Sequence, residues 1–235
     1  MRKICVVLTA RTSYAKIKPI LTALNNNKKI KLHLVLAASA VLERYGNTHI
    51  TVENDGFKID EKLYIIIESE TLLSSAKSTG LGIIEFAGAF KRINPDLVLV
   101  MADRFEVISA AIAATYQNIP LAHVQGGEVS GNIDEKVRHA ITKLADIHFP
   151  STKRAKQWLI KMGENPEKVF HTGCPSIDLV KKVIKNPESK INIYKKYGGV
   201  GSKPNLKNGF LIVMQHPVTT EHEDAEQQIE ETLYA

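Results

Sequence analysis

The chain alternates short, almost wholly apolar runs with longer stretches whose apolar residues recur every three or four positions. An unbroken apolar run is typical of a strand that a parallel sheet buries on both faces, whereas the longer period predicts a helix. The runs that predict strands are Ile4–Leu8, Lys31–Ala37, Leu63–Ile67, Leu97–Met101, Leu121–Val124, Ala145–Phe149 and Val169–Thr172. Strands that alternate with helices predict an α/β fold with a doubly wound, Rossmann-like parallel sheet.

The helices between these strands carry recognisable start and stop residues. Thr12 or Ser13 is expected to cap the first helix, and Pro19 is expected to kink or break it. A long helix is predicted over Ser74–Ile93, and Ser151-Thr152 is expected to cap a later one. Further helices are predicted around Ala110–Ala114, after Asp134 and over Ile177–Ile184.

The last fifty residues differ from the rest of the chain. Residues 186–208 are rich in lysine, glycine and proline, which is typical of a linker or a mobile surface segment. A strand over Phe210–Met214 and a helix from about Thr220 to Leu233 follow, but one strand and one helix cannot bury a core. We therefore expect a Rossmann-like domain over residues 1–185, the linker, and the start of a truncated second domain over 209–235.

Composition narrows the class of protein. Of the 235 residues, 44% are hydrophobic and 24% charged, as in an ordinary globular protein. The net charge of +6 comes from scattered lysines rather than a basic stripe, so no nucleic-acid partner is expected. Cys5 and Cys174 lack metal-ligand spacing and fit a reducing compartment. With no signal peptide and no membrane span predicted, we expect a cytoplasmic protein without a membrane partner or a metal.

Candidate chemistry gathers between residues 94 and 145. The apolar run Leu97–Met101 ends at Asp103-Arg104, and the run Leu121–Val124 ends at the loop Gln125–Glu128, which is followed by Asp134-Glu135. In open α/β sheets, ligands bind outside the carboxyl ends of neighbouring strands. These acids, the arginine and the paired glycines of the loop therefore predict one reaction site.

A dinucleotide cofactor is not expected. The turn after the first strand, Thr9–Ser13, lacks the G-x-G-x-x-G pattern that lets a backbone approach a pyrophosphate. Gly80-Leu81-Gly82 does not follow a predicted strand, so it is poor evidence for such a site. We therefore expect no cofactor.

Four strings carry a resemblance to a known family: MADRFEV, AHVQGGEVSGNIDEKVRHAITKLADIHF, TGCPSIDLV and MQHPVTTE. They closely resemble the hydrolysing UDP-N-acetylglucosamine 2-epimerases, over essentially the whole chain and most densely between residues 94 and 180. Bacterial members of that family make N-acetylmannosamine for sialic acid, and relatives act on a diacetamido sugar nucleotide for legionaminic acid. The resemblance implies a UDP-sugar substrate and the first half of a two-domain GT-B-type fold.

The family's chemistry explains the residue types. A base removes the C2 proton as UDP leaves C1, which gives a 2-acetamidoglucal; water then adds at C1 while a proton reaches C2 from the opposite face. This route needs carboxylates on both faces of the sugar and cations on the diphosphate, and no nicotinamide. On that basis Asp103, Glu128 and Asp134 are the expected catalytic residues, with Glu135 in reserve. The expected substrate-binding residues are Arg11, Arg104, Gln125, Gly127, Arg138, His139 and His216.

Several of these residues have a structural alternative. Asp134 stands where an N-cap belongs, and Glu128 could hydrogen-bond backbone amides of its glycine-flanked loop. Arg11 could be an exposed turn cation. Of the two candidate diphosphate ligands, Arg104 at a strand end is favoured over Arg138.

Two positions depart from the family pattern. Gln125 stands where several sialic-acid-pathway members place a catalytic glutamate, and Ala102 replaces the glycine of the usual GDRF string. Both leave the identity of the sugar open. The competing hypotheses are a non-hydrolysing 2-epimerase, a GT-B glycosyltransferase and an inactive truncated relic. We expect the complete enzyme to be a homo-oligomer and residues 1–235 alone to be inactive.

Overall fold

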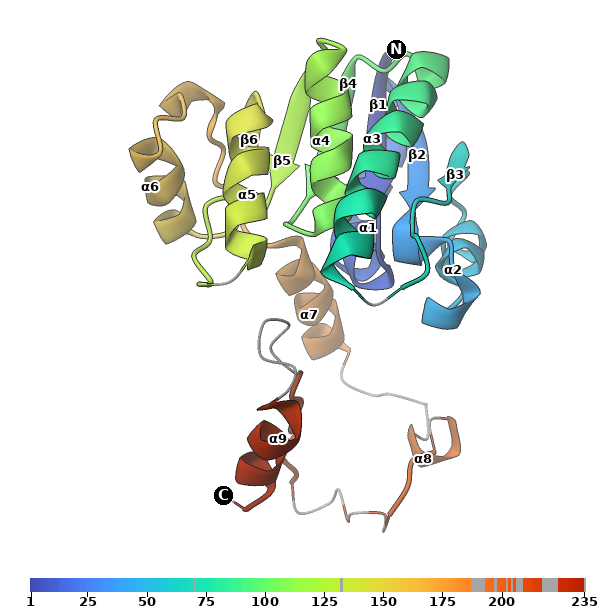
Figure 1. Cartoon of the computed structure of the whole chain (residues 1–235), viewed down its shortest axis with the longest axis vertical. Coiled ribbons are helices and arrows are strands. Elements are labelled where there is room, and N and C mark those ends of the chain that lie inside the picture. Colours follow the sequence, from blue (N-terminus) through green and yellow to red (C-terminus); the bar gives the residue numbers. More distant parts are fainter. Residues whose placement is uncertain are drawn as a thin grey trace. The chain divides into compact units, whose positions relative to one another are not determined.

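The structure is a computed structural model, in which residues 1–69, 71–131, 133–186, 193–196, 198–201, 203, 205, 209–216 and 224–234 are described. The chain divides into two compact units, unit 1 over Met1–Asn186 and unit 2 over Pro187–Ala235 (Figure 1). The expected catalytic residues all lie in unit 1.

Unit 1 contains one six-stranded sheet in which every paired strand is parallel to its neighbour. The strands, in chain order, are β1 (Arg2–Leu8), β2 (Ile30–Ala37), β3 (Glu61–Leu63), β4 (Leu97–Met101), β5 (Leu121–Val124) and β6 (Ile147–Phe149). Their spatial order is β3-β2-β1-β4-β5-β6. This order confirms the predicted doubly wound sheet, and it places the topological switch point between β1 and β4, where such folds bind ligands.

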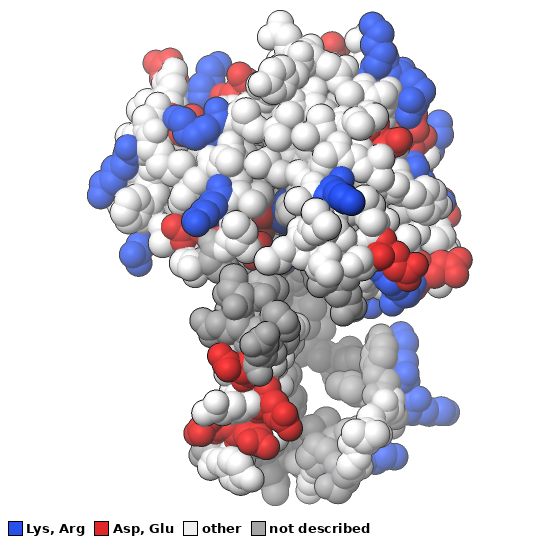
Figure 2. Space-filling view, viewed as in Figure 1, with Lys and Arg blue, Asp and Glu red and all other residues white. Residues whose placement is uncertain are grey.

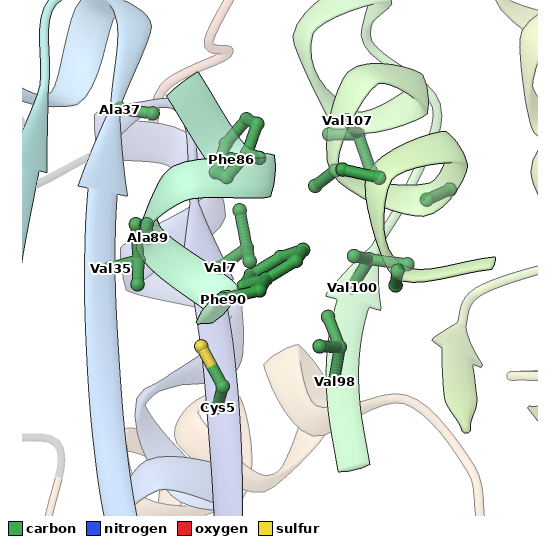
Figure 3. Packing of buried hydrophobic residues seen from close by; sticks show 14 of the residues in the cluster. Cys5, Val7, Val35, Ala37, Phe86, Ala89, Phe90, Val98, Val100 and Val107 are labelled. Atoms are coloured by element: carbon green, nitrogen blue, oxygen red, sulfur yellow. The ribbon is translucent and has the colours of Figure 1, made fainter. Parts of the chain in front are cut away.

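Helices cover both faces of the sheet, because alternate strand residues point to opposite sides. One face packs against α3 (Leu72–Ile93), α4 (Phe105–Tyr116) and α5 (Ile133–Leu144), which lie side by side in Figure 1. Figure 3 shows Phe86 and Phe90 of α3 directed toward Val7 of β1. Both phenylalanines are fully buried, and each stabilises the fold by about 2–3 kcal/mol. The other face packs against α1 (Arg11–Asn25) and α2 (Thr48–Asn54).

The first helix differs from the sequence prediction in its cap and in the effect of Pro19. Its N-cap is Ala10, without a side-chain hydrogen bond, so Thr12 and Ser13 lie inside the first turn instead of capping it. The helix also continues through Pro19 to Asn25 without a break. A proline inside a helix costs about 3 kcal/mol. The burial of Tyr14, Ile17 and Leu21 against the sheet offsets that cost.

The later part of unit 1 has less strand than predicted. The β3 strand ends at Leu63 rather than Ile67, and the predicted strand Val169–Thr172 is reduced to one bridge between Val169 and His148. Its partner β6 has three residues, so there is little backbone for a further strand to pair with. Three helical segments complete the unit: α6 (Lys153–Lys161), η3 (Pro166–Lys168) and α7 (Pro175–Lys185). Thr152 caps α6 as predicted, its hydroxyl oxygen lying 3.0 Å from the Ala155 nitrogen.

Unit 2 corrects the prediction for the end of the chain. Residues 209–216 are described and contain no strand, so the strand predicted over Phe210–Met214 is wrong. A strand needs a neighbour to satisfy its backbone groups, and within the described residues of this unit none pairs with it. The described helices of unit 2 are α8 (Ile193–Lys196) and α9 (Ala225–Tyr234); Thr220, where a helix was predicted to start, lies outside the described residues.

The surface of unit 1 carries charges of both signs. Figure 2 shows lysines and arginines interspersed with acids over the face it presents. Among the described residues, no helix combines the length and the apolar character that a membrane crossing requires.

Candidate active site

The carboxyl edge of the sheet holds three non-glycine residues in the left-handed backbone region. Ala38, Ala102 and Gln125 directly follow β2, β4 and β5, with φ angles of 54°, 67° and 65°. Such a conformation costs on the order of 1–3 kcal/mol for a non-glycine residue and concentrates at functional sites. The strained residues therefore mark the edge at which the sequence predicts the site, and Ala102 occupies the position where the resembling family carries glycine.

Asp103 and Arg138 form the central ion pair of this edge. Asp103 lies between β4 and α4, and its Oδ2 accepts hydrogen bonds from Nε of Arg138 at 2.8 Å and from Nη2. The arginine side chain is 7% exposed and the aspartate side chain 21%. Within the described part of the chain, no hydrogen bond reaches Oδ1 of Asp103, so that oxygen is available to a ligand.

Arg138 also fixes the loop that follows β5. Its Nη1 donates to the carbonyl oxygen of Glu128 at 2.6 Å and to the hydroxyl of Ser130 at 3.3 Å. The structure thus brings Asp103 and the Glu128 loop together through one buried guanidinium. Arg138 was predicted to bind substrate, but its donors on the described residues are directed to the protein itself.

Asp134 does not take its alternative role as N-cap, and Glu135, the reserve catalytic candidate, bonds to the loop instead. The α5 helix begins at Ile133, so Asp134 lies in the first turn rather than at the N-cap. Burial and the nearby Asp103 charge raise the pKa of Asp134 above its ordinary value. Glu135 instead accepts from the backbone nitrogens of Ser130 at 2.6 Å and Gly131 at 2.5 Å, and these bonds lower its pKa. Glu135 is therefore a loop anchor.

Glu128 is among the lining residues of two cavities. One cavity, of about 320 Å³, also includes Arg154 and Trp158 in its lining. The other, of about 520 Å³, includes Cys174 and Lys181. The structural alternative for Glu128, bonding to loop amides, is taken by Glu135 in the described residues. Glu128 stays a predicted catalytic residue.

Packing explains the two glycines of the loop. A Cβ atom on Gly127, whose φ is +83°, would lie 2.5 Å from the Ala155 carbonyl oxygen. A Cβ atom on Gly126 would lie 2.9 Å from both His123 Nδ1 and Thr142 Oγ1. Close contact with neighbouring elements therefore accounts for Gly127, and its predicted role in substrate binding stays a prediction.

Gln125 contacts the start of α7. Its side-chain nitrogen donates to the sulfur of Cys174 at 3.5 Å, and its backbone nitrogen donates to the Phe149 carbonyl at 3.0 Å. Burial opposes ionisation of Cys174, but hydrogen bonds from Ser176 and Ile177 outweigh it and lower the pKa of the thiol. The amide oxygen of Gln125 is the part of this side chain left to contact a ligand.

A second arginine–carboxylate pair, formed by Arg104 and Glu106, lines a cavity of about 400 Å³. We call this cavity the arginine pocket. Arg11, Arg44 and Arg104 line it together with Glu106 and several serines. The Arg104 side chain is 45% exposed and donates from Nη2 to Glu106, which is fully buried, at 3.0 Å. Although burial lowers the pKa of Arg104, the Glu106 carboxylate raises it above its ordinary value. Three guanidinium groups around one cavity suit a phosphate-bearing ligand.

The two predicted histidines belong to different units of the chain. Nε2 of His139 is 3.7 Å from Glu135, its neighbour one turn earlier on α5. His216 is exposed and belongs to unit 2. Their substrate contacts stay predictions.

Sequence reasoning missed three residues that support the site: Glu106, His123 and Thr142. Each is fully buried. A signal existed for the first two, because a buried charge in a helix and a histidine inside an apolar strand both require a polar partner. Nothing in the local pattern identified Thr142 as that partner. No cluster of three potential metal ligands occurs in the described ranges.

The family model described as UDP-N-acetylglucosamine 2-epimerase matches residues 22–235. A Legionella pneumophila protein named UDP-N,N'-diacetylbacillosamine 2-epimerase (hydrolyzing) is 34% identical over all of this chain and 60% of its own length. An Escherichia coli polysialic acid biosynthesis protein, P7, is also 34% identical, over 58% of its length. A Neisseria meningitidis UDP-N-acetylglucosamine 2-epimerase is 28% identical over 94% of this chain and 56% of its own.

Solved structures of UDP-N-acetylglucosamine 2-epimerases have a similar fold. A crystal structure of UDP-N-acetylglucosamine 2-epimerase matches 84% of this chain and 55% of its own, with a TM-score of 0.72 and 25% identity. The Neisseria meningitidis enzyme bound to UDP-GlcNAc matches 83% of this chain and 51% of its own, with a TM-score of 0.70 and 25% identity. The chain therefore spans little more than half the length of these relatives, and its sheet corresponds to one half of a two-domain GT-B-type fold.

Proposed function

Because this chain belongs to the UDP-N-acetylglucosamine 2-epimerase family, we propose that the whole protein carries out the hydrolysing form of this reaction. By the whole protein we mean residues 1–235 with any residues that continue them. The substrate is a UDP-N-acetylhexosamine, and the products are UDP and the free manno-configured sugar. The alternatives are a non-hydrolysing 2-epimerase, a glycosyltransferase and an inactive protein.

The reaction proceeds by elimination and then addition. A carboxylate takes the C2 proton while the bond between C1 and the UDP oxygen breaks, so that a C1–C2 double bond forms and UDP leaves with the electron pair. Water then adds its oxygen to C1 and gives up one proton to a carboxylate, while a carboxyl group delivers a proton to C2 on the opposite face. Such steps need one group ready to accept a proton and another ready to donate one.

One observation carries the proposal: two acids of unlike environment lie at the same edge. Asp103 is ion-paired with Arg138 and keeps one oxygen available, whereas burial and the Asp103 charge raise the pKa of Asp134. Pairs of carboxyl groups whose environments differ in this way are typical of acid–base catalysis. We assign proton transfer to Asp103 and Asp134, with Glu128 as the third acid.

The arginine pocket supplies the cations for the leaving group. We propose that Arg104 and Arg11 bind the diphosphate, because both line the pocket and the Arg104 side chain is 45% exposed. Arg138 does not share this task in our proposal. Its 7% exposure and its three internal acceptors suit it to holding Asp103 and the Glu128 loop.

For the sugar, we propose a diacetamido UDP-hexosamine in preference to UDP-N-acetylglucosamine. Gln125 cannot exchange a proton at neutral pH, so it is suited to recognition. Its side-chain nitrogen is directed to Cys174, which leaves the amide oxygen to accept a hydrogen bond from an amide N–H of the sugar. A relative named for a diacetylated sugar is among those at 34% identity.

The test is a comparison of UDP release from the two sugar nucleotides, with the sugar product identified by NMR. We expect UDP and a free manno-configured diacetamido sugar, formed with the higher kcat/KM. A product that keeps its UDP would support the non-hydrolysing reaction instead. Release that depends on an added acceptor would support a glycosyltransferase.

Residues 1–235 alone are proposed to bind UDP weakly and to turn over no substrate. The family's reaction depends on closing the site around the leaving group, and the chain spans 60% of the Legionella relative. Calorimetric titration with UDP and a UDP-release assay on these residues would test this. Measurable release would show that this part of the enzyme suffices.

A further inference from the structure

A buried histidine contacts the turn that carries Asp103. His123 is the third residue of β5 and is 0% exposed. Its Nε2 is 2.9 Å from the carbonyl oxygen of Ala102, and its Nδ1 is 3.2 Å from Oγ1 of Thr142. Because a carbonyl oxygen can only accept, Nε2 carries the ring proton and Nδ1 accepts from the threonine hydroxyl. The two partners therefore select one neutral tautomer.

Ala102, the residue that His123 holds, is strained and stands next to Asp103. Its φ of 67° is one that alanine rarely adopts. The strained residue is fixed to β5 on both sides: its nitrogen donates to the Val124 carbonyl at 3.0 Å, and its own carbonyl accepts from His123. Loss of the second contact would allow Ala102 to relax and would redirect Asp103.

The surrounding chain keeps this arrangement in place. Gly126 leaves the room that the His123–Thr142 pair needs, since a Cβ atom there would lie 2.9 Å from both groups. Thr142 is one helical turn beyond Arg138 on α5, and Arg138 binds the Asp103 carboxylate. The α5 helix therefore reaches the Ala102-Asp103 turn twice, once through His123 and once through Arg138.

We infer that His123 is a positioning residue, whose neutral ring holds Ala102 in its left-handed conformation and thereby directs Asp103 toward the substrate. The catalytic part of this inference rests on the proposed function, while the conformational part does not. Burial lowers the pKa of His123 to about 4, so the ring stays neutral around pH 7. The titratable groups that act on it are His148 on the neighbouring strand, Asp103 and Arg138.

The first test needs no substitution. In residues 1–235 labelled with ¹⁵N, the His123 ring should show a protonated Nε2 and an unprotonated Nδ1 between pH 6 and pH 8. The opposite tautomer would overturn the inference, because Nε2 could then not donate to Ala102.

The second test separates positioning from core packing. His123→Gln places an N–H near the Nε2 position and keeps a donor for Ala102, whereas His123→Asn matches the Nδ1 position and loses that donor. We expect the Ala102 Cβ shift and the Arg138 Nε–H signal to change in His123→Asn and to stay close to wild type in His123→Gln. His148→Asn is the matched control, because His148 is 1% exposed and pairs with His123 in the sheet register. Equal changes in all three variants would contradict a positioning role.

The third test is a double-mutant cycle. Glycine adopts a positive φ without strain, so Ala102→Gly should recover part of the loss caused by His123→Asn. In the whole protein we expect His123→Asn to lower kcat by about 10- to 100-fold with little change in KM, and the added Ala102→Gly to restore at least half of this loss on a logarithmic scale. Strictly additive effects would show that His123 does not act through Ala102.

The two claims can fail separately. If the NMR changes occur but the wild-type protein converts no sugar nucleotide, the proposed function fails and the conformational role of His123 stands. If the protein is active and His123→Asn, folded to the same extent, keeps its kcat, the proposed function stands and the positioning role fails.

Discussion

The two arginine–carboxylate pairs at the carboxyl edge are built in opposite ways. In the arginine pocket, the acid Glu106 is fully buried and the arginine Arg104 is 45% exposed. Next to it, the arginine Arg138 is 7% exposed and the acid Asp103 is 21% exposed. One pair therefore presents a cation to solvent and the other a carboxylate, and in each the buried member holds the exposed one.

This inversion indicates how one edge can serve two parts of the same substrate. A diphosphate needs cations and a sugar C2 needs a carboxylate, but four unpaired charges placed together would be costly to desolvate. Each exposed group is paired with a buried group of opposite charge, so the edge offers a cation for the diphosphate and a carboxylate for the sugar. In each pair, the more exposed residue is the one that we propose contacts the substrate, and the more buried residue positions it.

Replacement of the exposed acid should have the largest effect on the reaction. Asp103→Asn in the whole protein should lower kcat by about 10²- to 10⁴-fold, because it removes a proton-transfer group. The buried Arg138 would lose its counter-charge, so we also expect a loss of about 1–2 kcal/mol in the free energy of unfolding. Turnover and urea unfolding measure the two effects. Near wild-type turnover would remove Asp103 from the mechanism.

A fall in pH should lower the free energy of unfolding, because the buried His123 ring is protonated in the unfolded chain at a higher pH than in the folded protein. The pKa of this ring is about 4 in the folded protein, below its ordinary 6.5, so the unfolded chain binds the proton more strongly. The free energy of unfolding is therefore unaffected by this group above pH 6.5 and falls by about 3 kcal/mol in total as the pH is lowered from 6.5 to 4. Urea unfolding of residues 1–235 from pH 7.5 to pH 4 measures it. The same slope in His123→Gln would show that other groups are responsible.

Replacement of the exposed cation should separate binding from stability. Arg104→Ala should weaken UDP binding by about tenfold and leave Glu106 buried without a counter-charge, at a cost of about 2–3 kcal/mol. The double variant Arg104→Ala/Glu106→Gln should recover the stability and leave the binding weak. Calorimetry with UDP and urea unfolding give both quantities. A double variant that also recovers UDP affinity would exclude Arg104 as a phosphate ligand.

The smallest expected effect concerns Arg11. A Cβ atom on Gly46 would lie 3.2 Å from Nη1 of Arg11, so Gly46→Ala should displace that guanidinium and weaken UDP binding by about two- to threefold. Gly56→Ala is the matched control: Gly56 has the same φ of +86° and no neighbouring atom within 4 Å. Both should lose about 1 kcal/mol of stability through backbone strain. Equal UDP affinity in the two variants would place Arg11 outside the binding site.

The sequence predicted the sheet well because its strands are buried on both faces. Leu97–Met101 and Leu121–Val124 have the predicted bounds, since polar or turn residues border each apolar run. The strand predictions that were wrong concern Val169–Thr172 and Phe210–Met214, for which the described residues offer little or no neighbouring strand. Phe210–Met214 is as apolar as β4, yet a local pattern contains no information about whether a neighbouring strand exists.

The site was predictable as a location and less so as an assignment of roles. The strand-end rule found Asp103, Arg104 and Gln125 correctly at one edge. The sequence ranked Asp134 above Glu135 as a catalytic candidate but left open whether Asp134 caps the helix, because the direction of side chains at a helix start depends on where the helix begins. Arg138 was the less favoured candidate for the diphosphate, and the sequence could not show that it is buried, because burial depends on how α5 packs, which is a tertiary property.

The central claim is that the whole protein breaks the bond to UDP and inverts C2 through exchange of its proton. The most direct measurement is NMR of the reaction in D₂O with the diacetamido sugar nucleotide. We predict free UDP and a manno-configured sugar that carries deuterium at C2, because the proton removed by the base is replaced from solvent. A product that stays linked to UDP, or one that keeps hydrogen at C2, would contradict the account.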